Sequence, residues 1–326
     1  MKVEYIPYRL GKQSAAIQMG GLINPAELRT SKHKPFVNSN KPNCVVYQLW
    51  AGNFPLMGES YLTYLQYSIM SQMAHTDIRE YSDMYIFVSE SLYGQVVYHL
   101  STLVDESCII SVRNNFAYKY VISTHPILEN YNSISIIDAD MFLYSKEQST
   151  FYKDIVEYFK TDNTTTFLLP QYEENTKYAL NSRLIEYDIN MTQSEFEIFL
   201  IKNSGISSEK LNSFLTDTHW WLSCVTIFNP RKFTRSDKSN YYKLMNANSL
   251  IGLWDDELVW LLWLYINDKK IKDVTTQFNA KFKLDIDTHK YKFERGLQLI
   301  HPIVARNFFN YQPIVVMENI KNAYLK

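Results

Sequence analysis

The sequence lacks the features that mark secreted, membrane-spanning and disulfide-rich proteins. Only 3 of its 326 residues are cysteine, and each lies in an apolar segment, so we expect reduced, buried thiols. No apolar run approaches the roughly 20 residues that a membrane-spanning helix needs. The first residues lack the apolar core of a signal peptide. These absences predict a soluble, cytoplasmic protein, in a host's cytoplasm if the source is viral.

A strong charge of one sign, a glycine-rich phosphate loop and internal repeats are missing as well. The formal net charge is −1, so no overall field favours a nucleic acid or an anionic membrane. The stretch Ala-Gly-Asn at 51–53 follows the first expected strand but is a poor phosphate loop. Aromatic residues, in contrast, make up 15% of the chain, which suits surfaces that stack bases or sugar rings and also suits core packing.

A short, isoleucine-rich run at 133–137 ends in two aspartates, Asp138 and Asp140. An apolar run of this length without polar alternation predicts a strand buried on both faces. Because side chains along a strand repeat with period two, both carboxylates should leave the sheet on the same side. They would repel each other unless a cation lay beside them, and such oxygen ligands suit Mg²⁺ or Mn²⁺ shared with a phosphate. A turn or a helix N-cap is the alternative.

Apolar runs alternate with segments of helical spacing through the first half of the chain. Strands are expected at 44–50, 84–88, 108–112 and 133–137, and helices at 61–73, 95–103 and from Asn114 or Asn115 toward Leu128. This alternation predicts an α/β fold with a mostly parallel central sheet flanked by helices. Ligands of such sheets bind beyond the carboxyl ends of the strands, so the aspartates should share an edge with the end of the first strand.

The second half of the chain is more polar. We expect helices at 151–159, 171–217 and 254–266, and strands at 166–169, 219–228, 282–286 and 297–301. The helix at 254–266 is apolar on nearly every face and should be buried. No long linker is present, so we expect an irregular segment at 1–43, a single domain at 44–310 with 171–217 as a helical insertion over the site, and a tail at 311–326.

The order of these features resembles that of glycosyltransferases with the GT-A (Rossmann-like) fold, over residues 44–305. The segment from Tyr118 and Lys119 to the two aspartates is similar to the Tyr-Arg … Asp-x-Asp region of several such families, with Lys119 where arginine is usual. The stretches Thr-Ile-Phe-Asn at 226–229 and Trp-Asp-Asp-Glu at 254–257 resemble acceptor-side segments of retaining galactosyl- and N-acetylgalactosaminyltransferases.

This resemblance implies a metal-dependent glycosyltransferase that moves a sugar from a nucleotide sugar to a hydroxyl acceptor. UDP is preferred as the nucleotide because it is the commonest in these families. The acceptor can be a glycan, a lipid-linked sugar or a protein. Retention and inversion of stereochemistry both stay open, with a lean toward retention.

The resemblance also implies a metal site for Mn²⁺ or Mg²⁺ on the diphosphate. We expect Asp140 to bind the metal directly, and Asp138 to hold it through water or to bind the ribose or the sugar. His301 resembles the C-terminal metal histidine of many such families, and a core histidine at a strand end is the alternative. The metal would act as a Lewis acid as the nucleoside diphosphate departs.

Three further residues are candidates for the nucleotide side of the site. Lys119 and Arg113 are the nearest cations for phosphate, with a solvated helix face as the alternative. Trp50, at the end of the first expected strand, is the candidate to stack on the base, with packing as the alternative.

Asp255, Asp256 and Glu257 are the candidate catalytic residues, at the start of the helix at 254–266. One of them would accept the proton of the acceptor hydroxyl, and Glu257 could face the sugar carbon as nucleophile or stabiliser. Capping of the helix is the alternative. Trp220 and Trp221 are candidate acceptor-binding residues, and core packing is the alternative for one of them because neighbours on a strand face opposite ways.

Two other functions fit parts of this pattern. A sugar nucleotidyltransferase also needs carboxylates and Mg²⁺ at a strand edge, but such enzymes usually begin with a glycine-rich phosphate loop. A carbohydrate- or partner-binding module would keep the fold without turnover. Pyrophosphate production from UTP and a sugar phosphate would identify the first, and absence of metal-dependent UDP-sugar hydrolysis the second.

Overall fold

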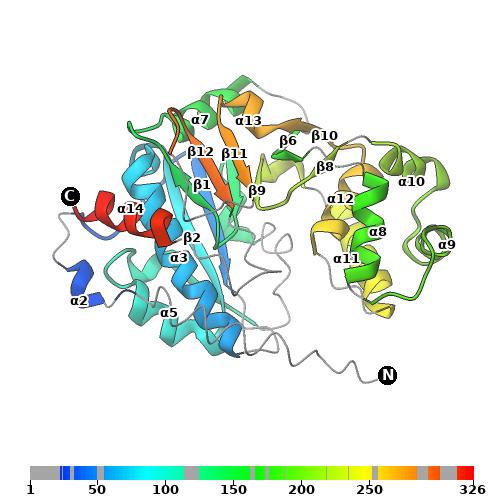
Figure 1. The fold of residues 1–326 in the computed structure, drawn as a ribbon, viewed down its shortest axis with the longest axis horizontal. Helices are drawn as coiled ribbons and strands as arrows, with labels where there is room; N and C mark the ends of the chain where they lie inside the picture. The colour runs from blue at the N-terminus through cyan, green and yellow to red at the C-terminus, as the bar shows by residue number, and fades with distance from the viewer. Residues whose placement is uncertain are drawn as a thin grey trace.

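A large mixed sheet between two groups of helices forms the centre of the molecule (Figure 1). The computed structural model describes residues 23, 25–29, 33–49, 55–113, 125–161, 166–172, 176–186, 188–217, 219–233, 235–251, 256–284, 293–301 and 314–326. Among the helices in these ranges, none is long and apolar enough to cross a membrane.

The main sheet has the strand order β10-β6-β9-β4-β1-β2-β3 in the described part of the chain. In that order the strands are Lys270–Asp273, Thr166–Leu169, Val225–Phe228, Ser133–Ile137, Asn43–Leu49, Ser82–Ser89 and Ile109–Val112. All neighbours run parallel except that β9 is antiparallel to both β4 and β6. The predicted α/β class with a mostly parallel sheet is therefore confirmed. One edge of this sheet, the carboxyl edge, holds the carboxyl ends of the parallel strands and the amino end of β9.

Strand β1 shows why these apolar runs have no polar alternation. Val45 and Tyr47 pack into one hydrophobic cluster, whereas Cys44 and Val46 pack into another on the opposite face. Successive side chains of a strand point to opposite faces, so a strand covered on both sides needs apolar residues at every position. The three cysteines are free thiols and are buried, as expected.

Helices cover both faces of the sheet. The first hydrophobic cluster includes residues of α2 (Pro25–Leu28), α3 (Pro55–His75), α4 (Ile78–Tyr81), α5 (Tyr93–Leu100), α7 (Phe151–Thr161), α13 (Val274–Gln277) and α14 (Ile314–Leu325). The second includes residues of α8 (Thr176–Glu186), α9 (Gln193–Ser204), α10 (Ser208–Leu215), α11 (Arg235–Leu250) and α12 (Asp256–Ile266), which gather on the right of Figure 1. Short 3₁₀ turns lie at Glu90–Leu92, Glu106–Cys108, Pro126–Leu128 and Pro230–Lys232.

Helix α12 is buried, as its apolar pattern predicted. Its residues from Leu258 to Leu264 are at most 1% exposed. The rings of Trp260 and Trp263 stack with centroids 4.7 Å apart, and both meet the edge of Phe167 on β6. The helix therefore packs directly against the main sheet at β6.

The single strand expected at 219–228 is wrong, because the segment forms two strands. β8 (Trp220–Trp221) pairs with β7 (Gln171–Tyr172) in a separate small sheet, and β9 begins only at Val225. Between them the backbone N–H of Ser223 donates to the Glu257 carboxylate at 2.9 Å. The Glu257 side chain thus provides the acceptor that the N–H of Ser223 would otherwise need from a neighbouring strand. Because this N–H is satisfied, the chain can leave the small β7–β8 sheet and enter the main sheet at this point.

The segment 171–217 is largely helical, as expected, and α9 begins with a capping box formed by Thr192 and Glu195. Helix α11 was not anticipated. Its buried Tyr241, Leu244 and Met245 have helical spacing, but polar residues surround them in the sequence. Most of the helix expected from Asn114 or Asn115 lies outside the described residues, as does most of the segment 1–43.

Candidate functional site

The two aspartates lie in a tight turn at the carboxyl end of β4. The N–H of Met141 donates to the carbonyl of Asp138 at 3.0 Å, which closes a turn over residues 138–141. The N–H of Asp138 donates to the carbonyl of Cys224 at 2.9 Å, so the turn is tied to the start of β9. Aspartate is favoured at the first position of such turns. A turn was the alternative explanation for the two aspartates in the sequence, and the structure contains both the turn and the pair of neighbouring carboxylates.

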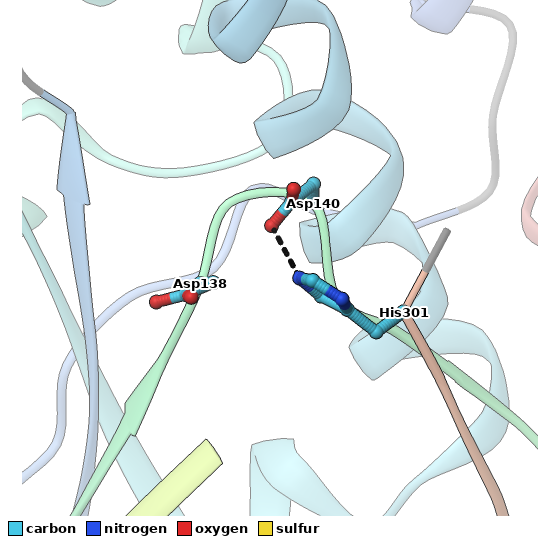
Figure 2. Close-up of side chains that lie close together, drawn as sticks. All are labelled: Asp138, Asp140 and His301. Carbon is cyan, nitrogen blue, oxygen red and sulfur yellow. Dashed lines mark ion pairs between the residues drawn. The ribbon is translucent and has the colours of Figure 1, made fainter. Parts of the chain in front are cut away.

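His301 reaches this turn from a three-stranded sheet formed by β11 (Lys281–Leu284), β12 (Gln298–His301) and β5 (Phe142–Tyr144). β12 and β5 are antiparallel, with Ile300 opposite Phe142. His301 is the next residue on β12, so the pairing places its ring beside the turn. Its Nε2 atom lies 3.4 Å from Oδ1 of Asp140, the contact drawn in Figure 2.

The three side chains form a donor set that fits a divalent metal. One ligand atom from each of Asp138, Asp140 and His301 lies within 4.8 Å of the others. Oxygen donors suit Mg²⁺ and Mn²⁺, and an imidazole is also a ligand for transition metals such as Mn²⁺. The side chains of Asp140 and His301 are only 12% and 20% exposed, and two carboxylates held so close together are unfavourable without a compensating positive charge.

The pKa of His301 is raised above its ordinary value. Burial alone would lower it, but the charge and hydrogen bond of Asp140, together with the charges of Asp138 and Glu257, outweigh burial. Without metal, the charged imidazole therefore stabilises the fold at low pH, and this contribution is lost as the pH rises through the raised pKa. A metal must displace the same proton.

We therefore expect Mn²⁺ binding to weaken as the pH falls through the raised pKa of His301, by about tenfold per pH unit below it. Calorimetric titrations with Mn²⁺ between pH 5.5 and 8.5 measure the slope. The His301→Gln variant should bind more weakly at high pH and show a flatter profile, because glutamine does not titrate. Equal slopes for both proteins would contradict the assignment.

A polar stripe on the buried helix α3 holds the chain that follows Asp140. The hydroxyl of Ser68 donates to the carbonyl of Met141 at 2.5 Å. The hydroxyl of Ser71 accepts from the N–H of Leu143 at 3.0 Å, and Nδ1 of His75 lies 2.8 Å from the carbonyl of Ser145. These residues recur at helical spacing along α3, so one helix face satisfies the unpaired edge of β5.

Replacement of Ser68 by alanine should destabilise the protein by about 1–3 kcal/mol. Ser68 is fully buried and bonds both the Met141 carbonyl and the Tyr47 hydroxyl, which lies 2.9 Å away, so the change removes the donor to the Met141 carbonyl and leaves Gln72 as the bonded neighbour of the Tyr47 hydroxyl. Urea denaturation measures the loss. Ser101→Ala is the control, because its hydroxyl bonds at the exposed end of α5 and should matter by less than about 0.5 kcal/mol. Equal effects would contradict the burial argument.

Glu257 is the one of the three predicted acidic residues whose side chain is described. Its Oε1 atom accepts from Nη2 of Arg183 at 2.8 Å and from Nε1 of Trp220 at 2.9 Å. Its Oε2 atom accepts from the N–H and the hydroxyl of Ser223, at 2.9 and 3.2 Å. Asp256 is the first residue of α12, and Asp255 lies outside the described residues.

The two tryptophans have different environments. Trp220 is 2% exposed and its indole N–H is bonded to Glu257, which favours core packing for this residue. Trp221 is half-buried, and its indole N–H lies 3.5 Å from Oδ2 of Asp217. Trp220 belongs to the second hydrophobic cluster and Trp221 packs against it, so both rings contribute to packing here.

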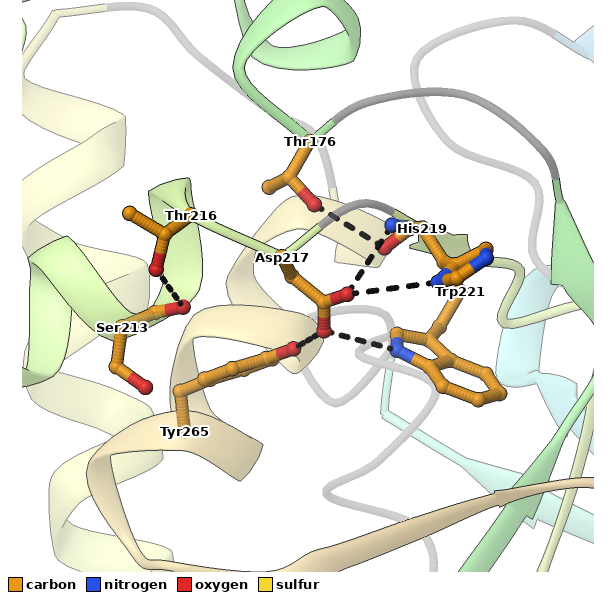
Figure 3. A network of polar contacts seen from close by, with 7 residues as sticks. All are labelled: Thr176, Ser213, Thr216, Asp217, His219, Trp221 and Tyr265. Atoms are coloured by element: carbon orange, nitrogen blue, oxygen red, sulfur yellow. Dashed lines mark hydrogen bonds and ion pairs between the residues drawn. The ribbon is translucent and has the colours of Figure 1, made fainter.

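Asp217 is the centre of a polar network that the sequence analysis missed (Figure 3). Its carboxylate accepts hydrogen bonds from the hydroxyl of Tyr265, the indole of Trp221 and the N–H of His219, the last at 3.1 Å. Burial, together with the hydrogen bond to Asp217, raises the pKa of Tyr265, which is therefore neutral at ordinary pH. The network joins the end of α10 to the end of α12 and fixes the indole of Trp221.

Of the three residues predicted for the nucleotide side of the site, Arg113 alone lies in the described part of the chain. Arg113 is exposed and directly follows β3, three strands from β4. Neighbouring strands are about 4.8 Å apart, so its backbone lies roughly 14 Å across the sheet from Asp138. An arginine there is better placed for a distal part of a ligand than for a metal-bound phosphate. Trp50 and Lys119 lie outside the described residues.

No protein-family model matches this sequence, and a search of curated proteins found no match. The fold is similar to core-mannan synthase A from Aspergillus fumigatus in its Mn/GDP form, with a TM-score of 0.42, 10% identity, and coverage of 75% of this chain and 76% of that chain. It is similar to mouse xyloside xylosyltransferase 1, with a TM-score of 0.43, 11% identity, and coverage of 81% and 98%. It is also similar to an inositol-1-phosphate CTP transferase from T. maritima, with a TM-score of 0.40, 11% identity, and coverage of 87% and 98%.

Two of these three proteins are glycosyltransferases, the class to which the sequence resemblance points, and one transfers a nucleotide.

Proposed function

We propose that the protein is a metal-dependent glycosyltransferase that moves a sugar from a nucleotide sugar, with UDP preferred, to a hydroxyl acceptor. The observation that carries the proposal is the convergence of Asp138, Asp140 and His301 at the carboxyl edge of a mostly parallel sheet. Ligands of such sheets bind at that edge, and a diphosphate is the common partner of a metal held by carboxylates.

In this proposal Asp140 and His301 bind the metal directly, and Asp138 binds it directly or through water. A divalent cation held there would offset the charge of the departing nucleoside diphosphate. Arg113, Lys119 and Trp50 keep their proposed places on the nucleotide side.

The acceptor side is proposed to lie along β8 and the helical segment 171–217. Trp221 offers a half-buried indole whose orientation is fixed by Asp217, and an aromatic face packs well against the apolar face of a sugar ring. Asp255 and Asp256 remain the proposed proton acceptors for the acceptor hydroxyl, which can belong to a glycan, a lipid-linked sugar or a protein.

Calorimetric titration of UDP into the protein, first with Mn²⁺ and then with EDTA, tests the proposal. Binding that requires Mn²⁺ would support it, and metal-dependent hydrolysis of a UDP-sugar would establish turnover. Pyrophosphate released from UTP and a sugar phosphate would identify a nucleotidyltransferase instead. If neither UDP nor GDP bound under any condition, the proposal would be overturned in favour of a binding module.

A further inference from the structure

The carboxylate of Glu257 joins helix α12 to two segments that are distant in the sequence, α8 and the stretch from Trp220 to Ser223. It lies in the first turn of α12 and accepts hydrogen bonds from Arg183 on α8, Trp220 on β8 and Ser223 in the turn before β9. Its side chain is 14% exposed, and the Arg183 side chain is 25% exposed. Both carboxylate oxygens are therefore engaged with donors of the protein itself.

The turn that Glu257 holds is also the turn that holds Asp138. Cys224 follows Ser223, and its carbonyl accepts from the N–H of Asp138 at 2.9 Å. Beyond this bond the β4–β9 ladder continues, with Ile137 opposite Val225. Ser223 and Cys224 are 3% and 4% exposed, so water does not readily replace a lost partner. The position of the Asp138 backbone thus depends on the Ser223–Cys224 turn, and Glu257 holds that turn through the N–H of Ser223.

We propose that Glu257 is a positioning residue for the metal centre. It fixes the Ser223–Cys224 turn and through it the backbone of Asp138, and through Arg183 it couples that backbone to helix α8. The inference rests on the proposed metal-dependent function but assigns Glu257 a different role from those considered from the sequence, which were proton acceptor, nucleophile and electrostatic stabiliser. A nucleophile needs an oxygen directed at the sugar carbon, whereas each oxygen of Glu257 already accepts two hydrogen bonds.

Two substitutions test this role on the full chain. Glu257→Gln leaves a single acceptor oxygen where the carboxylate has two, so the N–H of Ser223 and the indole of Trp220 compete for it. Arg183→Met removes the α8 contact and leaves Glu257 in place. Glu195→Ala is the matched control, because this glutamate caps α9 in the same helical region and has no bond to the turn. The Mn²⁺ affinity of each metal-free protein is measured by calorimetry, and its thermal midpoint by circular dichroism.

Glu257→Gln should weaken Mn²⁺ binding by about 10- to 100-fold, as loss of a group that orients a metal ligand does, and Arg183→Met should weaken it in the same direction. Glu195→Ala should lower the thermal midpoint without changing Mn²⁺ affinity. Metal-dependent hydrolysis of a UDP-sugar is measured on the same variants. Unchanged Mn²⁺ affinity in both site variants, with this hydrolysis lost only in Glu257→Gln, would overturn the positioning role in favour of a nucleophile.

The remaining outcomes also decide between a positioning role for Glu257 and no such role. If Glu257→Gln does not fold, Arg183→Met and Trp220→Phe, which removes the indole donor, are compared, and unchanged Mn²⁺ affinity in both overturns the inference. If the wild-type protein binds no Mn²⁺, the proposed function fails and this inference fails with it. Normal Mn²⁺ binding by wild type together with unaffected variants removes the inference alone.

Discussion

Asp140→Asn should weaken Mn²⁺-dependent UDP binding by more than about 100-fold. Loss of a residue that only orients a metal ligand weakens metal binding by about 10- to 100-fold, and Asp140 is a proposed ligand itself. The metal-free variant should be at least as stable as wild type. Asparagine keeps the shape of the side chain but removes a negative charge from the ligand set. Asp140 is 8% exposed and shares the site with Asp138, so its charge is unfavourable when no cation is present. Function and stability should therefore change in opposite directions.

Two measurements separate these effects. UDP is titrated in the presence of Mn²⁺, and thermal midpoints are compared in EDTA at pH 8.5, where a charged His301 contributes least. Asp154→Asn is the control, because Asp154 lies on the exposed side of α7, where it accepts from the Thr150 hydroxyl at 2.9 Å. If Asp140→Asn kept metal-dependent UDP binding, or if it lost stability in EDTA like a core variant, Asp140 would be a structural residue.

Asp237→Ala should destabilise the protein by about 3–5 kcal/mol, the cost of leaving a buried charge without its partner. Nζ of Lys269 lies 3.1 Å from Oδ2 of Asp237, and both side chains are only 7% exposed. The same ammonium lies 5.5 Å from the ring centroid of Trp263, whose indole N–H donates to the carbonyl of Asp237 at 2.8 Å. Removal of the carboxylate leaves the lysine charge in this apolar setting.

Urea denaturation of three variants measures this cost. The double variant Asp237→Leu with Lys269→Met removes both charges and should recover most of the lost stability, because the penalty comes from the unpaired charge. Glu157→Ala breaks an exposed pair with Lys160, whose side chains are 54% and 56% exposed, and should cost less than about 1 kcal/mol. A cost for Asp237→Ala as small as that of Glu157→Ala would show that Lys269 reaches water.

Much of the central sheet could be predicted from local sequence patterns. The apolar runs of β1, β2 and β4 have no polar alternation because helices cover both faces of the sheet, and this pattern was sufficient to infer a mostly parallel α/β fold. The apolar residues on nearly every face of α12 likewise predicted its burial. That the two aspartates lie at the carboxyl edge followed from the same reasoning. Strand periodicity did not place their side chains, because β4 ends at Ile137 and both residues lie in the turn that follows.

Local patterns were sufficient for the central strands and the buried helix α12, because each depends on residues within one element. The order of features also pointed to Asp138, Asp140 and His301 as metal-site residues, but how the site residues meet depends on contacts between elements. His301 meets Asp140 through the pairing of β12 with β5, and Glu257 ends the strand expected at 219–228 by bonding Ser223. The Asp217 carboxylate, which follows α10, accepts from the Tyr265 hydroxyl on α12. Such contacts join segments that are distant in sequence, so no local pattern of residues encodes them.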